Sequence, residues 1–170
     1  MSRLLPALLS LMLAASGALA QGYGYDSSSK TGLNDRTTDR VVRLLEQGLR
    51  QCQALDPVYR YDCYRQNYRA AGQQLDRNPA YAPARQALRD VESTLSDVLK
   101  TSADPAAKPE RRQGKRFAAI TTAAIPGSRA AFTSALDQAA TQLLRSTGSS
   151  RDHFARIASA LNSNKVFLRP

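Results

Sequence analysis

The sequence predicts an all-α protein, a small bundle of about five or six helices whose first two helices form an αα-hairpin clamped by a disulfide. Three observations predict this fold. Apolar residues recur every three or four positions along most of the chain after residue 36, which places them on one face of each helix. No run shows the alternation with a period of two that is typical of a strand. The two cysteines, Cys52 and Cys63, flank the break between the first two helical segments.

Residues 1–20 have the features of a secretory signal peptide. Arg3 supplies a positive charge, residues 4–15 are mostly apolar, and residues 18–20 read Ala-Leu-Ala, a small-x-small cleavage pattern. The apolar run is too short for a comfortable membrane span and contains Pro6. We therefore expect an exported protein, periplasmic or secreted, with no transmembrane segment in the mature chain. Residues 21–36 have little to bury and are predicted to be a disordered lead-in.

Residues 37–170 are predicted to form a single helical domain, and its first two helices meet at Asp56 and Pro57. Asp56 is a favourable N-cap, and Pro57 suits the first helical position because no amide hydrogen is needed there. We expect the upstream helix to begin near Thr37 or Thr38. The residues predicted to face the core are Val42, Leu45, Leu49 and Cys52 upstream, and Tyr61, Tyr64, Tyr68, Ala71 and Leu75 downstream.

The two cysteines are predicted to form a disulfide. Cys52 lies about five residues before the bend and Cys63 about six after it. In an antiparallel pair of helices these two positions lie at nearly the same height above the turn. Their Cα atoms can then come within the separation that a disulfide needs. Two buried, reduced cysteines are the alternative, but the export signal favours an oxidising compartment.

The remaining helices follow from the same spacing. A third helix is predicted around residues 81–98, and residues 101–116, with two prolines and no periodicity, are predicted to be a basic linker in loop conformation. Residues 117–125 are predicted to be a short apolar helix that Pro126 and Gly127 stop. Ser128 is expected to cap the next helix, and Ser149 or Ser150 a last one. The apolar residues 166–168 are expected to dock against the bundle.

The charge balance indicates the kind of partner. The chain has 24 Lys and Arg against 14 Asp and Glu. Removal of the predicted signal peptide, which contains Arg3, leaves 23 basic and 14 acidic residues, a net charge of +9. This favours an acidic cell-envelope polymer, an anionic membrane surface or an acidic partner protein, whereas export disfavours nucleic acid. The alternative is that the charge serves solubility alone.

Two groups of residues are candidates for binding. Five of the seven tyrosines lie between positions 59 and 81, interleaved with arginines that make bidentate contacts to anions. Tyr61, Tyr64 and Tyr68 share one helix face, which favours a core role over a binding face. The outward candidates are Tyr59, Arg60, Arg65 and Arg69. The second group lies on or beside the predicted linker and consists of Lys108, Arg111, Arg112, Lys115 and Arg116. These residues either contact a polyanion or belong to a solvated linker.

No catalytic, metal or cofactor site is predicted. With one histidine, and both cysteines in the predicted disulfide, the ligands of a zinc site are lacking. Nothing in the sequence marks a nucleophile or an orienting group for His153. Asp56 and Asp62 are the best candidates for a hydrolytic carboxylate pair, although a helix cap and a solvated charge explain them better.

The sequence therefore favours an exported helical interaction protein without catalytic activity. It would contact its acidic partner through the Tyr/Arg-rich hairpin and the basic loop. The alternative is a cell-envelope hydrolase that cleaves glycans with a carboxylate pair. A deep cleft containing two carboxylates would favour the enzyme, and a basic surface would favour the binding protein.

Overall fold

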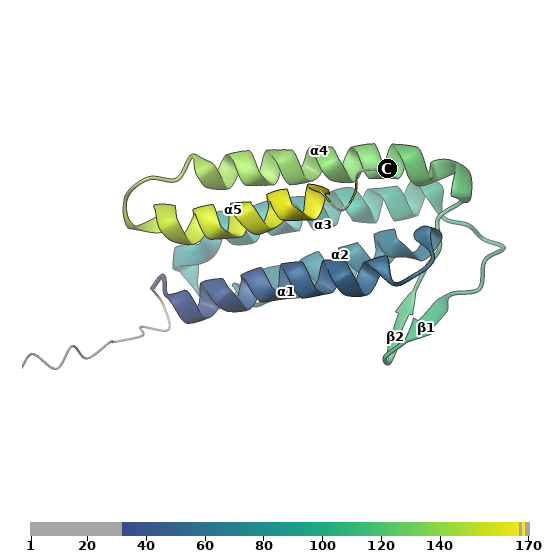
Figure 1. The fold of residues 1–170 in the computed structure, drawn as a ribbon, viewed down its shortest axis with the longest axis horizontal. Coiled ribbons are helices and arrows are strands. Elements are labelled where there is room, and N and C mark those ends of the chain that lie inside the picture. Colours follow the sequence, from purple (N-terminus) through teal and green to yellow (C-terminus); the bar gives the residue numbers. More distant parts are fainter. Residues whose placement is uncertain (1–31, 167, 169–170) are drawn as a thin grey trace, which may run out of the picture.

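The structure is a computed structural model that describes residues 32–166 and 168 (Figure 1). The predicted signal peptide and residues 21–31 of the predicted lead-in lie outside the described residues. Within the described part, no helix is long and apolar enough to cross a membrane. Asp35 and Arg36, which were predicted to be disordered, belong to the first helix. That prediction was wrong because Asn34 caps the helix: its side chain accepts a hydrogen bond from the N–H of Thr37 at 2.9 Å.

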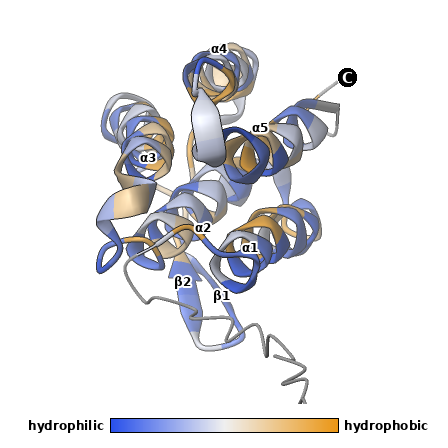
Figure 2. Ribbon diagram, turned by 90° about the vertical axis from the view of Figure 1, so that its left-hand side faces the viewer, coloured by the Kyte–Doolittle hydropathy of each residue, from blue (hydrophilic) through white to orange (hydrophobic). Residues whose placement is uncertain are grey.

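The described chain contains five α-helices that form a closed ring, so the predicted all-α bundle is confirmed. Each helix packs against the next in sequence, and the last packs against the first (Figures 1 and 2). Their apolar faces point toward the common centre, and polar residues face outward (Figure 2). The helices are α1 (Asp35–Gln53), α2 (Arg60–Gln73), α3 (Ala82–Ser102), α4 (Ile125–Leu144) and α5 (Arg151–Val166).

The junction between α1 and α2 is as predicted. Asp56 caps a 3-10 turn, Pro57–Tyr59, by accepting a hydrogen bond from the N–H of Val58 at 3.2 Å. Across this turn, Cys52 of α1 and Cys63 of α2 form a disulfide with a Cα–Cα separation of 5.5 Å. The disulfide therefore clamps the last turn of α1 to the first turn of α2.

Aromatic residues fill the middle of the bundle. Tyr61, Tyr64 and Tyr68 are buried, which confirms their predicted core role. The ring of Tyr64 stacks on Phe132 of α4 at a centroid distance of 5.0 Å, and Tyr68 meets the same ring edge to face. The core face of α1 differs slightly from the prediction because Val41 is fully buried and Val42 only partly.

Residues 101–116 are not the loop that the sequence predicted. Strands β1 (Glu110–Arg112) and β2 (Lys115–Phe117) form an antiparallel hairpin in which Arg111 lies opposite Arg116. Its turn residues, Gln113 and Gly114, have φ angles of 50° and 74°, the positive values that a tight hairpin turn requires. Strands of three residues are too short to show a period of two, so the sequence pattern did not reveal them.

The helix predicted at residues 117–125 is also absent. Phe117 ends β2, the chain then runs extended, and α4 begins at Ile125 after a 3-10 turn, Thr122–Ala124. Pro126 therefore starts a helix instead of stopping one, which agrees with its lack of an amide hydrogen. Ser128 is a buried residue inside α4 and not its cap. At the other end of the chain, Leu168 is 8% exposed, as the predicted docking requires.

Candidate functional site

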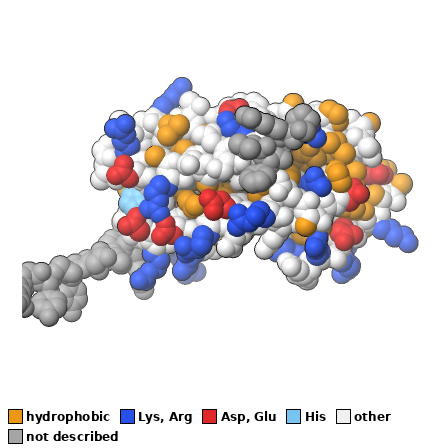
Figure 3. Space-filling model, in the orientation of Figure 1, with side chains coloured by type: hydrophobic (Ala, Val, Ile, Leu, Met, Phe, Trp, Pro, Cys, Tyr) orange, Lys and Arg blue, Asp and Glu red, His pale blue; other side chains and the backbone are white. Residues whose placement is uncertain are grey.

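A cavity of about 270 Å³ lies where the β-hairpin meets the clamped ends of α1 and α2. We call it the hairpin pocket. Lys and Arg side chains line the lower edge of the molecule, below α1 and over the hairpin (Figures 1 and 3). The residues that line the hairpin pocket are Arg50, Gln51, Ala54, Leu55, Cys63, Arg112, Gln113, Lys115 and Phe117.

Hydrogen bonds from α1 and α2 hold the hairpin in place. Arg112 of β1 donates from Nη1 to the carbonyl oxygen of Ala54, at the C-cap of α1, over 2.8 Å. Gln66 of α2 donates from Nε2 to the carbonyl oxygen of Arg116 in β2, also over 2.8 Å. Both strands are therefore attached to the bundle, and the hairpin is a fixed wall of the pocket.

The hairpin pocket has an apolar floor and a positive rim. Leu55, Cys63 and Phe117 are buried and form apolar parts of its surface. Arg50, Arg112 and Lys115 bring three positive charges, all on exposed residues. No lining residue carries a carboxylate. A cavity of this composition suits a ligand that combines an anionic group with an apolar surface.

The structure places the second predicted group partly in this pocket. Arg112 and Lys115 line it, whereas Arg111 and Arg116 lie across from each other on the exposed strands. Lys108 is exposed just before the hairpin. Arg50 also lines the pocket and was not among the predicted site residues, although its position two residues before Cys52 places it near the clamped junction.

Every member of the first predicted group contacts the protein itself. Tyr59 and Arg60 donate to backbone carbonyl oxygens, and Arg65 and Arg69 form ion pairs with acidic side chains. None of the four lines the hairpin pocket. Their intramolecular partners are, in order, Lys108, Leu55, Asp62 and Glu92.

The two carboxylates proposed for hydrolysis both have structural partners. Asp56 caps the 3-10 turn, as predicted. Asp62 is 5% exposed, so the prediction of a solvated charge was wrong. Its Oδ1 accepts from Nε and Nη2 of Arg65 at 2.9 and 2.6 Å, and its Oδ2 accepts from Gln66 Nε2 at 3.3 Å and Ala118 N–H at 2.8 Å. Four donors occupy this carboxylate.

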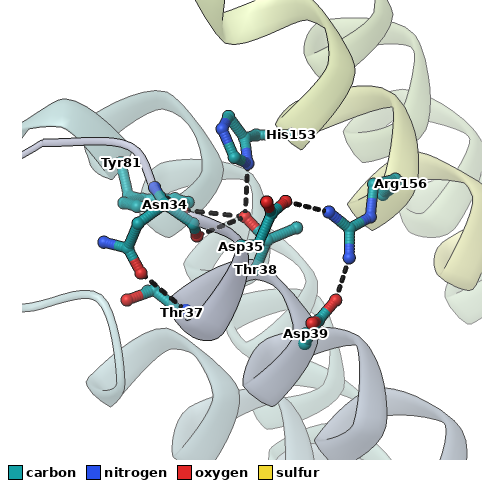
Figure 4. A network of polar contacts seen from close by, with 8 residues as sticks. All are labelled: Asn34, Asp35, Thr37, Thr38, Asp39, Tyr81, His153 and Arg156. Carbon is teal, nitrogen blue, oxygen red and sulfur yellow. Dashed lines mark hydrogen bonds and ion pairs between the residues drawn. The ribbon is translucent and has the colours of Figure 1, made fainter. Parts of the chain in front are cut away.

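His153 belongs to a polar network at the start of α1, at the end of the bundle away from the hairpin (Figures 1 and 4). Its Nδ1 lies 2.8 Å from the hydroxyl of Thr38, which lies 2.8 Å from the hydroxyl of Tyr81. Thr38 is fully buried, so a substrate does not reach its hydroxyl. Arg156 of α5 pairs with Asp35 and Asp39 beside it. The network joins α1 to the start of α3 and to α5.

We compared the chain with protein-family models, curated proteins and solved structures, and none of them matches it. The site is therefore interpreted from its own residues: a basic, apolar-floored pocket on a disulfide-clamped helical bundle.

Proposed function

We propose that the protein is an exported, non-catalytic binding protein and that its hairpin pocket holds part of an acidic polymer of the cell envelope. The observation that carries the proposal is the composition of the hairpin pocket, in which three cationic side chains surround an apolar floor without any carboxylate. The disulfide fits an oxidising compartment, and the signal peptide predicted at residues 1–20 supports a periplasmic or secreted location.

Each part of the pocket has a role in this binding. The guanidinium groups of Arg50 and Arg112 are suited to bidentate hydrogen bonds with a carboxylate or a phosphate. Lys115 adds a third positive charge. The apolar surface that Leu55 and Phe117 present to the pocket suits the apolar face of a sugar ring. The exposed residues Lys108, Arg111 and Arg116 extend the positive field beyond the pocket, so that a polymer longer than the cavity gains further contacts.

A glycan hydrolase is the alternative function. It needs two carboxylates that flank a substrate cleft. The hairpin pocket has none among its lining residues, and Asp62 is held by four donors. These observations favour the binding function over the enzymatic one.

The test is co-sedimentation of the purified protein with cell-wall sacculi, in parallel with anionic lipid vesicles, across a series of salt concentrations. We expect binding to sacculi that weakens as salt increases, because exposed charges are screened. The double variant Arg112→Gln/Lys115→Gln should bind about tenfold more weakly or worse, since each charged contact contributes about 1 kcal/mol or more.

A matched control removes two charges far from the hairpin. Arg145 and Arg151 are exposed at the opposite end of the bundle, so Arg145→Gln/Arg151→Gln should retain binding. An equal loss in both double variants would show attraction by net charge and not by the pocket. Binding to vesicles but not to sacculi would replace the polymer by a membrane surface, and no binding at low salt would refute the proposal.

A further inference from the structure

A second and smaller cavity, of about 80 Å³, lies between the first turns of α2 and α4. It shares no lining residue with the hairpin pocket. We call it the Arg60–Arg129 cavity. Its lining residues are Pro57, Arg60, Tyr61, Tyr64, Ile125, Arg129 and Leu168.

The electrostatic environment of this cavity is strongly positive. Two arginines and two tyrosines contribute the polar groups, and no lining residue is acidic. Two helices also begin here, α2 at Arg60 and α4 at Ile125, and each continues a 3-10 turn whose backbone N–H groups are bonded to carbonyl oxygens. Helix N-termini carry partial positive charge and favour anions. Asp56, which caps the 3-10 turn before α2, is exposed and does not line the cavity.

Arg60 is oriented by a hydrogen bond within the protein, and both arginines keep donors available. Arg60 donates from Nε to the carbonyl oxygen of Leu55 over 2.9 Å, which leaves its two terminal nitrogens for another acceptor. The hydroxyl of Tyr61 donates to the carbonyl oxygen of Ile125 over 3.1 Å, and the positive charge of Arg129 partly offsets the rise that burial causes in the pKa of Tyr61. A guanidinium has five N–H donors, so Arg129 also retains most of its donors.

Tyr64 supplies a hydroxyl that lacks a hydrogen-bond partner. Its side chain is 2% exposed and lines the cavity, and no described residue hydrogen-bonds to its hydroxyl. Burial raises the pKa of Tyr64 to about 12, although the charges of Arg60 and Arg129 act in the opposite direction. The hydroxyl is therefore protonated at neutral pH, and it can donate a hydrogen bond to an acceptor in the cavity.

We propose that the Arg60–Arg129 cavity binds a phosphate group, either the free ion or the terminal phosphate of a phosphomonoester. The two guanidinium groups bind two phosphate oxygens, and the Tyr64 hydroxyl donates to a third. One buried water needs roughly 10–15 Å³ of cavity space, so 80 Å³ fits a phosphate group but excludes a whole sugar or nucleotide. The remainder of a larger ligand would extend into solvent. This site goes beyond the proposed polymer binding and does not depend on it.

Titration of the protein with inorganic phosphate at neutral pH and constant ionic strength tests the proposal. Calorimetry measures the affinity, and tyrosine fluorescence reports on the cavity because the chain has seven tyrosines and no tryptophan. We expect saturable binding that Arg129→Gln weakens about tenfold or more, because the variant removes one of the two guanidinium groups that bind the phosphate oxygens. Arg145→Gln, which removes the same charge at the other end of α4, should leave the affinity unchanged.

Tyr64→Phe provides a second test that removes only one oxygen atom. We expect it to weaken phosphate binding about three- to tenfold while the thermal unfolding midpoint stays close to that of the original protein. Because this variant preserves the packing of the ring, it tests the site even where Arg129→Gln disturbs the fold. Tighter binding of glycerol phosphate than of inorganic phosphate would identify a phosphomonoester as the ligand, and the reverse would identify the free ion.

Three results would overturn the proposal. One is the absence of saturable binding up to about 20 mM phosphate, a very weak affinity by any measure. Another is an equal loss in Arg129→Gln and Arg145→Gln, which would show a general effect of charge. The third is binding of acetate as tight as that of phosphate, which would assign the cavity to carboxylates. The variant Arg112→Gln/Lys115→Gln should keep its phosphate affinity, so failure of the polymer-binding proposal is distinguishable from failure of this one.

Discussion

The carboxylate of Asp62 accepts a hydrogen bond from the backbone N–H of Ala118 at 2.8 Å. The two residues are 56 positions apart, and the bond joins α2 to the segment that follows the β-hairpin. Together with the bond from Gln66 to the carbonyl oxygen of Arg116, it fixes the second strand of the hairpin against the bundle. A buried acidic residue thus acts with Arg112 and Gln66 to fix the position of the hairpin pocket.

Replacement of Asp62 by Ala should lower the free energy of unfolding by about 2–4 kcal/mol, because it leaves Arg65 without its partner and Ala118 without an acceptor. Urea denaturation measures this loss, and faster hydrogen exchange at the Ala118 amide would show that the hairpin loosens. The control is Asp97→Ala, which removes an exposed ion pair with Lys100 and should cost at most about 0.5 kcal/mol. Equal losses in the two variants would contradict the role of Asp62.

The disulfide between Cys52 and Cys63 should stabilise the protein by about 2–3 kcal/mol, because it closes a short loop and restricts the unfolded chain. The double variant Cys52→Ser/Cys63→Ser is therefore expected to unfold at a lower urea concentration. Thiol titration of the denatured protein should detect no free thiol before reduction and both thiols after it. Two thiols in the unreduced sample would refute the bridge.

Gly48 of α1 lies against Asn67 of α2, and a Cβ atom at position 48 would clash with the Asn67 side chain. Gly48→Ala should therefore destabilise the protein by about 1–3 kcal/mol, since the helices or Asn67 must move. Gly127 is the matched control because a Cβ atom there meets nothing within 4 Å. Gly127→Ala should be stabilising by about 0.5 kcal/mol. A thermal melt of each variant measures the difference, and a stabilising Gly48→Ala would contradict the close approach.

The stability of the protein should fall in alkaline solution. Burial raises the pKa of the Tyr61, Tyr64 and Tyr68 hydroxyls, that of Tyr64 to about 12. In the unfolded chain these hydroxyls ionise near about pH 10. Below that pH both states are protonated and stability is constant. Between about pH 10 and 12 the Tyr64 hydroxyl loses its proton only in the unfolded state, so the free energy of unfolding falls by about 1.4 kcal/mol per pH unit for this group. Tyr61 and Tyr68 act in the same direction.

Urea midpoints across this alkaline range check the effect. Tyr64→Phe removes one of the three buried hydroxyls, so its stability should fall less steeply with pH than that of the original protein. A midpoint that does not change with pH would contradict the prediction.

The sequence predicted the long helices well because each carries its own periodic signal. The buried residues from Tyr81 to Val98 followed from their spacing, since neighbours on a helix face are fixed by local geometry. The disulfide followed from spacing together with the export signal. Residues 101–125 were misread for the opposite reason. Their conformation is set by contacts with distant segments, such as the 3.0 Å bond from the Ile120 N–H to the Val58 carbonyl oxygen.

The site was predictable only in part. The basic residues Arg112 and Lys115 were visible as a local concentration of charge. The floor of the hairpin pocket was not, because Leu55 and Phe117 come together only when the hairpin folds back over the disulfide. The sequence gives no sign that Arg60 and Arg129 line the same cavity, since 69 positions separate them and neither belongs to a motif.

The direction of α1 has a practical consequence for presenting the molecule on a surface. This helix of 19 residues starts at the end of the bundle away from the β-hairpin and runs toward it, a rise of about 28 Å. A support or fluorophore attached just before α1 would therefore stand roughly one helix length from the hairpin pocket. Immobilisation through this end would leave both cavities facing the solution, which makes it the orientation of choice for measuring binding at a sensor surface.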